Sequence, residues 1–220
     1  MLIASGSPGD EFHDHLLARL PSAPSVAFVG AASGDRAQWF ERSANLLRRR
    51  YDARVRFART VPGPDYDREE TRRILDEAQL IYVGGGDVGV LAEHLCRDGL
   101  DEKIRQRRRD GAALLGVSAG AIGLGPAWVR FPDDDDEVTL PLRFACVGAM
   151  PIACDVHDEE SDWEELRALL DAWARVDPAA SVEAYGIPAG GALLLDGDDG
   201  VTHVGVAPRR LRLDRGRIVE

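Results

Sequence analysis

The sequence predicts a three-layer α/β/α fold around a mostly parallel central sheet, and three observations carry this prediction. Short apolar segments alternate with amphipathic helical segments through the first half of the chain, as in a parallel sheet covered on both faces. The segments 25–30 and 113–117 contain almost no polar residues, which is typical of strands buried on both faces. Beyond residue 180, strand-like segments are separated by turns at 196–200 and 214–216, so we expect antiparallel strands added to the sheet edge near the C-terminus.

The individual elements follow from where each hydrophobic pattern starts and stops. In the helical segments apolar residues recur every three or four positions, as Leu166, Leu169 and Leu170 do within 161–175. Strands are expected at 2–5, 25–30, 53–58, 79–83, 113–117, 127–131, 138–147 and 152–157. Helices are expected at 10–20, 33–50, 69–78, 88–95, 101–109 and 161–175. No internal repeat or low-complexity linker divides the chain, so we expect one domain over 1–220.

Composition narrows the classes of function before any motif is considered. The chain has 220 residues and a formal net charge of −11, so neither nucleic acid nor an anionic membrane is expected as a partner. It starts without the pattern of a signal peptide, and no apolar segment approaches the roughly 20 residues of a membrane span. We therefore expect a cytoplasmic protein. Its three cysteines are not spaced as metal ligands, so we expect reduced thiols. The motifs described below imply neither a metal nor an organic cofactor.

The segment 112–121 is the strongest functional signal in the sequence. An apolar strand leads into Gly116-x-Ser118-x-Gly120, and a small-residue helix start follows. A serine on such a sharp strand-to-helix turn has its hydroxyl lifted out of the sheet, and the N–H of the next residue, Ala119, points where an oxyanion forms. The pattern also arises by chance in a chain with 23 glycines, but the strand before it and the helix after it favour a functional serine. Ser118 is therefore the candidate nucleophile.

A glycine-rich loop, Gly84-Gly85-Gly86-Asp87, follows the strand expected at 79–83. Consecutive glycines let the backbone approach a ligand, and their N–H groups can donate to a substrate oxygen. Open α/β sheets bind ligands beyond the carboxyl ends of their strands, where this loop and Ser118 are both expected. Two other interpretations stay open. One is a tight turn alone, and the other is a dinucleotide loop spaced Gly84-x-Gly86-x-x-Gly89, which lacks the early position and the downstream acid.

His157 is the candidate general base. A serine needs a nearby base with a near-neutral pKa, and imidazole is the usual one. If 152–157 forms a strand, Asp155 and His157 lie on the face opposite to its apolar residues, so His157 is either solvated or directed into a site. The other histidines lie on expected helices or in a late hairpin, at His13, His15, His94 and His203.

These motifs together resemble a known family. The segments 81–91, 116–121 and 155–157 are similar, in order and separation, to three blocks of one serine peptidase family. Those blocks are Gly-Gly-Gly-Asn, the nucleophile segment and Asp-x-His, and the family is that of aspartyl dipeptidase (dipeptidase E) and cyanophycinase. The resemblance implies a flavodoxin-like, class I glutamine amidotransferase-like fold.

The resemblance also assigns a role to each candidate residue. It implies that Ser118 is the nucleophile and His157 its base, and that backbone N–H groups near Gly85 or Gly86 and of Ala119 form the oxyanion hole. The expected activity is hydrolysis of small peptides, including Asp-Xaa dipeptides, without a cofactor. A homodimer is a candidate assembly.

The sequence departs from the family pattern at the residue that would orient the histidine. The family commonly carries a late Gly-Ile-Asp-Glu segment, whereas here the segment 186–189 leaves Ala189 at the glutamate position. The candidates to replace that acid are Asp158, Glu159, Glu160, Glu183 and the acids at 133–136. Loss of the orienting acid slows a catalytic triad by about four orders of magnitude. The alternative function is therefore a catalytically weak or inactive relative that binds a small ligand or a protein partner.

Other charged residues carry further expectations. Asp87 stands where the family often has asparagine, and we expect Asp87 and Asp155 to contact the substrate. The acidic run 133–137 is interpreted as a solvated loop, with binding of a hard cation as the alternative. The arginine runs at 48–50 and 105–109 are interpreted as solvated helix ends, with recognition of a substrate carboxylate as the alternative.

Overall fold

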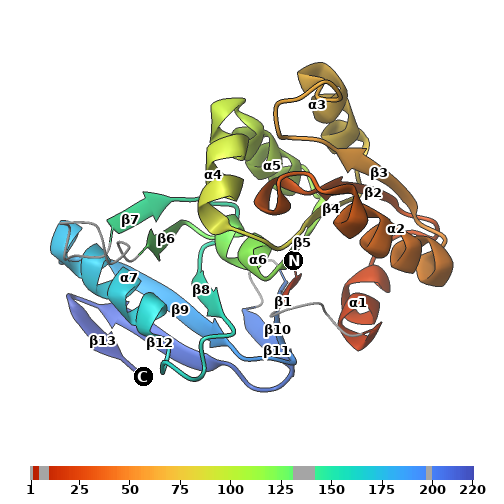
Figure 1. The fold of residues 1–220 in the computed structure, drawn as a ribbon. Coiled ribbons are helices and arrows are strands. Elements are labelled where there is room, and N and C mark those ends of the chain that lie inside the picture. Colours follow the sequence, from red (N-terminus) through yellow and green to blue (C-terminus); the bar gives the residue numbers. More distant parts are fainter. Residues whose placement is uncertain (1, 5–9, 131–141, 197–199) are drawn as a thin grey trace.

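A seven-stranded sheet forms the centre of the computed structural model, which describes residues 2–4, 10–130, 142–196 and 200–220 (Figure 1). Its order is β11-β10-β1-β5-β4-β2-β3, and the run from β1 to β3 is parallel throughout. The strands are β1 (Leu2–Ala4), β2 (Ser25–Val29), β3 (Arg54–Ala58), β4 (Leu80–Val83), β5 (Ala113–Val117), β10 (Gly191–Leu195) and β11 (Val201–Gly205). This sheet confirms the predicted parallel core, and β10 and β11 confirm antiparallel strands at its edge.

Helices cover both faces of the sheet and complete the predicted three layers. Alternate side chains of β2 and β4 enter two separate hydrophobic clusters, one on each face. The first face is covered by α1 (Asp10–Leu17) and α2 (Ala37–Tyr51). The second is covered by α3 (Arg68–Glu77), α4 (Val88–Arg97), α5 (Leu100–Arg109) and α6 (Ala119–Leu124). Among the helices of the described residues, none combines the length and apolar character that crossing a membrane requires.

The remaining late strands form a second sheet instead of extending the first. β9 (Ser181–Ile187), β12 (Arg209–Asp214) and β13 (Arg217–Val219) join β8 (Ala153–Val156) in the order β13-β12-β9-β8. The apolar face of α7 (Glu164–Val176) packs on alternate residues of β9 and β12, so these strands bury their apolar side under this helix. The sequence predicts that all the late strands extend the edge of the central sheet. This prediction is confirmed for β10 and β11, and it is wrong for β9, β12 and β13, which belong to the second sheet.

Two other segments differ from the predicted boundaries. The helix expected at 33–50 is divided into a 3₁₀ turn, Ala31–Ser33, and α2, because Gly34 adopts φ +67° between them. The strands expected at 127–131 and 138–147 correspond to β6 (Ala127–Arg130) and β7 (Leu142–Ala145), which pair antiparallel. The acidic run 133–137 between them lies outside the described residues.

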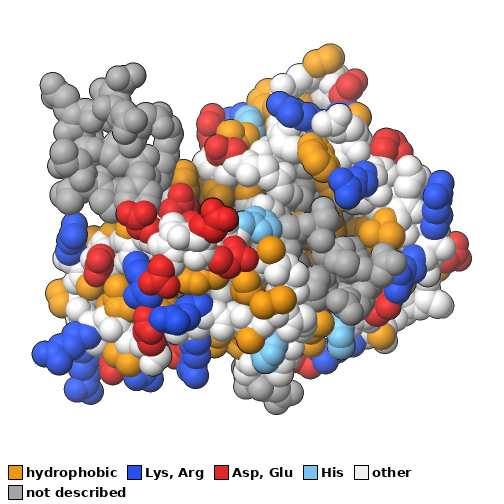
Figure 2. All heavy atoms as spheres, turned by 60° about the horizontal axis from the view of Figure 1, so that its bottom comes forward, with side chains coloured by type: hydrophobic (Ala, Val, Ile, Leu, Met, Phe, Trp, Pro, Cys, Tyr) orange, Lys and Arg blue, Asp and Glu red, His pale blue; other side chains and the backbone are white. Residues whose placement is uncertain are grey.

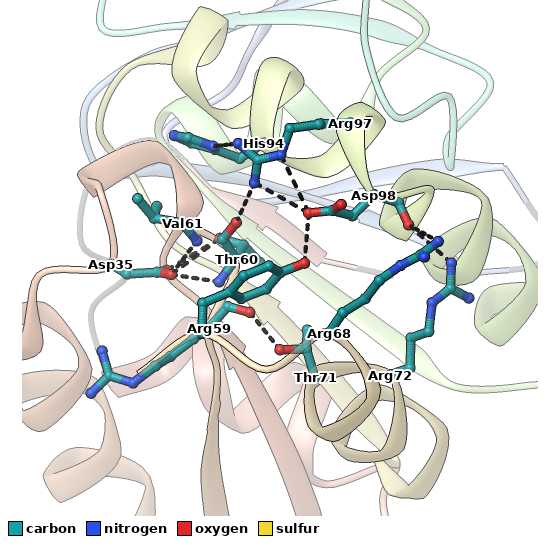
Figure 3. Close-up of polar contacts among 11 residues, drawn as sticks. Asp35, Arg59, Thr60, Val61, Arg68, Thr71, Arg72, His94, Arg97 and Asp98 are labelled. Carbon is teal, nitrogen blue, oxygen red and sulfur yellow. Dashed lines mark hydrogen bonds and ion pairs between the residues drawn. The ribbon is translucent and has the colours of Figure 1, made fainter. Parts of the chain in front are cut away.

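A buried carboxylate fixes the segment that follows β2 (Figure 3). Asp35 is 8% exposed and accepts hydrogen bonds from the backbone N–H groups of Thr60 (2.5 Å) and Val61 (2.7 Å). Each bond to the carboxylate is charge-assisted, so together they compensate for its removal from water. The 3₁₀ turn at Ala31–Ser33 is thereby anchored to the segment that follows β3.

The same network continues to α4 (Figure 3). Arg97 donates to the backbone oxygen of Thr60 at 3.1 Å and pairs with Asp98 at 3.2 Å. The hydroxyl of Tyr66 donates to Asp98 at 2.6 Å, and burial together with this bond raises the pKa of Tyr66 to about 12. Tyr66 therefore keeps its proton at neutral pH, and the end of α4 is fixed to the loops after β2 and β3.

Replacing Gly120 with alanine is expected to destabilise the protein. A Cβ atom at this position would lie 2.2 Å from the carbonyl oxygen of Val83, and backbone on both sides cannot move away cheaply. We expect the free energy of unfolding, measured by urea denaturation, to fall by about 1–3 kcal/mol or more. Gly63→Ala is the control, because a Cβ there meets open space. Equal unfolding midpoints for the two variants would contradict this close approach.

Candidate active site

Ser118 occupies a strained turn between β5 and α6. Its backbone has φ +52° and ψ −125°, a conformation that L-residues rarely adopt. The flanking glycines make room for it, because a Cβ atom on Gly116 would lie 2.7 Å from the carbonyl oxygen of Gly120. The serine is half-buried at the carboxyl end of its strand. This geometry is that of a nucleophile elbow.

The glycine-rich loop lies directly beside this serine. A Cβ atom on Gly85 would be 3.0 Å from the Cβ of Ser118. The ends of the loop are fixed by the hydrogen bonds Gly84 N–Val29 O (3.0 Å) and Asp87 N–Ala32 O (2.8 Å). Between these ends, the N–H groups of Gly85 and Gly86 have no backbone acceptor in the part of the chain that the structure describes. Gly85 and Gly86 therefore keep donors of the kind that an oxyanion hole uses, and Gly85 lies directly beside Ser118.

A cavity of about 1540 Å³ opens beside Ser118. Its wall includes the serine, the glycine loop, Asp87 and one side of α2. The carboxylate of Asp87 begins α4 by accepting from the N–H of Val90 at 2.8 Å. Pockets for small ligands usually measure about 300–1,000 Å³, so this cavity has room for more than a small ligand.

His157 follows β8 and belongs to the second sheet. Its backbone has φ +63°, and its N–H donates to the carbonyl oxygen of Ile187 at 3.3 Å, so β9 holds the turn. The side chain is exposed and is not among the described residues that line the cavity. However, α6 begins immediately after Ser118 and packs against β8, so serine and histidine lie on neighbouring elements. Figure 2, in which the lower side of Figure 1 comes forward, shows acidic side chains gathered on one part of this face.

The strand register separates Glu183 from His157. β8 pairs with β9 so that Val156 lies opposite Ile187, which places Glu183 four residues, or about 13 Å, back along β9. Its carboxylate pairs instead with Arg210 at 3.0 Å. The structure therefore removes Glu183 from the acids that could orient the histidine.

Glu159 contacts the backbone of Ala189, the residue that stands where the family commonly has a glutamate. Its Oε1 atom accepts from the N–H of Ala189 at 2.5 Å, which ties the loop after β8 to the loop after β9. Asp158 is half-buried, and its Oδ2 atom has no hydrogen-bond partner among the described residues. Both acids lie within two residues of His157, and only the carboxylate of Glu159 is fixed beside Ala189.

Comparison with known proteins assigns the family. A sequence model of peptidase family S51 matches residues 1–202. The chain belongs to peptidase family S51. Peptidase E of Streptomyces coelicolor is 27% identical over 215 residues, which cover 87% of this chain and 80% of that protein. Peptidase E of Haemophilus influenzae is 29% identical over 134 residues, which cover 57% of this chain and 58% of that protein.

A solved structure supports the same fold for this S51 chain. The crystal structure of a peptidase from an acI-B1 Actinobacterium superposes with a TM-score of 0.69 at 21% identity. The match covers 99% of this chain and 95% of that one. Membership of a peptidase family makes hydrolysis of peptides the class of activity, and the fold is that of its structural neighbours.

Asp155 of this S51 chain lies away from the cavity. It is 5% exposed, and the structure does not place it among the residues that line the cavity described above. Burial is the main cause that raises the pKa of Asp155, to about 7, and the negative charges of Glu165 and Asp158 raise it further. The N–H of Val156 donates to this carboxylate at 2.7 Å and acts in the opposite direction. The position of Asp155 therefore does not support the expected contact with a substrate bound in this cavity.

The arginines of α2 are only partly anticipated by the sequence, because recognition of a substrate carboxylate is the alternative role of the run at 48–50 and Arg42 is not singled out. Arg42 and Arg49 both line the cavity, and the run at 48–50 is also exposed in the last turn of α2, as its interpretation as a solvated helix end predicts. Arg42, Arg49 and the aromatic Trp39 are separated by seven and three residues, which is the spacing of one helix face. That spacing was the available signal. Within the described ranges, no three His, Cys, Asp or Glu side chains gather as a metal site.

The raised pKa of Asp155 predicts a specific dependence of stability on pH. Folded Asp155 keeps its proton up to about pH 7, whereas the unfolded chain releases it near pH 4, so wild-type stability falls as pH rises between these values. Asp155→Asn mimics the protonated form and removes this loss. By urea unfolding at pH 8, we expect the variant to be more stable than the wild type by about 1–4 kcal/mol.

The control for this measurement is Glu164→Gln, which changes an exposed acid at the start of α7. The free energy of unfolding of this control is expected to fall as pH rises, as it does in the wild type. If Asp155→Asn loses the same stability between pH 5 and pH 8 as the wild type, the buried acid is not the cause.

Proposed function

We propose that the chain is a serine peptidase that hydrolyses small peptides, Asp-Xaa dipeptides among them, with Ser118 as the nucleophile. The observation that carries the proposal is the strained turn at Ser118, which faces the cavity beside the donors of Gly85 and Gly86. Such strain persists where the surrounding structure maintains it, and it is concentrated at functional sites. Membership of family S51 supplies the peptidase class.

The proposed reaction proceeds through an acyl-enzyme. His157 takes the hydroxyl proton as Ser118 attacks the peptide carbonyl, and the resulting oxyanion accepts from the N–H groups of Ala119 and Gly85 or Gly86. The imidazolium returns its proton to the leaving amine as the C–N bond breaks. A water molecule, deprotonated by the same imidazole, then hydrolyses the ester and restores the serine.

Glu159 is proposed as the acid that orients His157. Its carboxylate is held at the backbone of Ala189, where the family commonly has a glutamate side chain. A carboxylate in that place would stabilise the imidazolium formed during each proton transfer. Asp87 is proposed to pair with the substrate ammonium group, since it is the acid among the described residues of the cavity wall.

Replacing the proposed nucleophile provides the first test. We expect Ser118→Ala to lower kcat/KM for a dipeptide panel by at least about four orders of magnitude, because the acyl-enzyme cannot form. A fluorophosphonate probe should label the wild type at Ser118 and leave the variant unlabelled. Circular dichroism checks that the variant is folded. Equal turnover by both proteins, or no turnover and no labelling of the wild type, would favour a binding role for the cavity.

Replacing the proposed orienting acid provides the second test. We expect Glu159→Gln to lower kcat by about 10²–10⁴-fold with little change in KM, since the acid acts through the histidine. Glu159→Asp should restore part of the lost rate. Glu160→Gln is the matched control, as it removes a neighbouring exposed carboxylate. A rise in KM at unchanged kcat would assign Glu159 to substrate binding instead.

A further inference from the structure

One face of α2 presents positive charge to the cavity beside Ser118. Trp39, Arg42, Leu46 and Arg49 all line this cavity, and their spacing of three, four and three residues places them on one side of the helix. Arg36, directly before the helix, lines it as well. The described wall thus carries several arginines and one acid, Asp87, although the whole chain has a net charge of −11.

Within the described residues, the charges of Arg36, Arg42 and Arg49 on this face are not neutralised by ion pairs. Arg50 pairs with Asp14 at 2.6 Å, and Arg48 donates to the carbonyl oxygen of Val55 at 3.2 Å, so these two arginines have structural contacts. Among the described residues, by contrast, no carboxylate forms an ion pair with Arg36, Arg42 or Arg49. These three guanidinium groups therefore remain available to an anionic ligand.

Arg42 is exposed, and its charge acts on a buried residue of the cavity wall. Tyr82 is a buried residue of the cavity wall, and burial raises the pKa of its phenol. The hydrogen bond with Ser43 and the charge of Arg42 both act in the opposite direction. Arg42 therefore lies close enough to the cavity wall for its charge to act on the Tyr82 hydroxyl.

Helix stability explains the arginines at the end of α2, Arg49 included, but it does not explain Arg36 at the start of the helix. Basic residues are favourable in the last turn of a helix, which accounts for arginines at 48–50, but they are unfavourable at its start. Arg36 stands at the N-cap of α2 and makes no side-chain capping bond, and the first turn contains no acid. A positive charge at this end therefore has a role other than stabilising the helix.

The length of this face exceeds that of a dipeptide. From Trp39 to Arg49 the helix advances ten residues, or about 15 Å. An extended peptide advances about 3.3 Å per residue, so about four or five residues are needed to follow the face. The cavity volume of about 1540 Å³ agrees with a ligand of that size.

We propose that this cavity takes acidic oligopeptides, whose carboxylates pair with Arg42 and Arg49 while one peptide carbonyl lies at Ser118. The inference rests on the proposed peptidase function and extends it from dipeptides to longer acidic substrates. The arginines act as specificity residues at a distance from the reacting bond.

The test compares two hexapeptides that differ only in charge, Ala-Ala-Glu-Glu-Glu-Glu and Ala-Ala-Gln-Gln-Gln-Gln. Binding is measured on the Ser118→Ala protein by fluorescence anisotropy of peptides labelled through an added C-terminal lysine. Turnover of the unlabelled peptides is measured separately on the wild type. The cavity variants are Arg42→Gln and Arg49→Gln, and Arg108→Gln is the control because it removes an equal charge from an exposed position on α5.

We expect the glutamate peptide to bind at least about tenfold more tightly at low salt, and added salt to reduce this preference. Arg42→Gln and Arg49→Gln should each reduce the preference about two- to fivefold, and Arg108→Gln should leave it unchanged. Equal binding of the two peptides would overturn the inference, as would an equal effect of Arg108→Gln. Equally effective competition by an oligonucleotide of the same charge would also overturn it, since the surface would then bind any polyanion.

The two proposals fail in different ways. Wild-type turnover that depends on Ser118 but not on peptide charge would leave the peptidase function standing and overturn the acidic specificity. Charge-dependent binding without any turnover by the wild type would overturn the peptidase function, and with it the assignment of these peptides as substrates.

Discussion

The site depends on the close approach of three backbone segments, at the ends of β2, β4 and β5. A Cβ atom on Gly86 would lie 2.1 Å from the carbonyl oxygen of Ala32, and one on Gly120 would lie 2.2 Å from that of Val83. No side chain fits in either place, so the glycines there are a steric requirement. The absence of side chains is what allows the glycine loop and the Ser118 turn to be neighbours. The Asp35 network then prevents the segment after β2 from moving away.

The proposed catalytic groups come from two separately built parts of the molecule. Ser118 and the glycine loop belong to the main sheet, whereas His157 belongs to the second sheet and is held by Ile187. The contact between α6 and β8 joins these parts. Small residues at the start of α6 therefore have two effects, since they permit the serine turn and let β8 pack closely. This packing sets the position of His157, the proposed base, relative to Ser118, the proposed nucleophile.

The sequence was most informative where a local pattern was sufficient to determine the structure. β5 has the predicted bounds, 113–117, because an apolar run between a helix and a glycine turn has few alternatives. The pairing of late strands was not predictable, because it depends on how α7 buries its apolar face. The distance between Glu183 and His157 likewise follows from strand register, which no local pattern specifies. The arginines of α2 had visible helical spacing, but which side of the helix faces a cavity is a tertiary property.

The topology also determines when the site can be completed as the chain is made. The pairing of β2, β3, β4 and β5 and the turn into α6 need only residues up to Leu124. The turn that carries His157 is held by Ile187, about 60 residues later. Translation at roughly 5–20 residues per second separates these two events by about 3–12 seconds. A ribosome-bound chain can therefore hold the serine turn before it has a fixed base, and its proposed hydrolytic activity begins only after Ile187 has been added and β9 has formed.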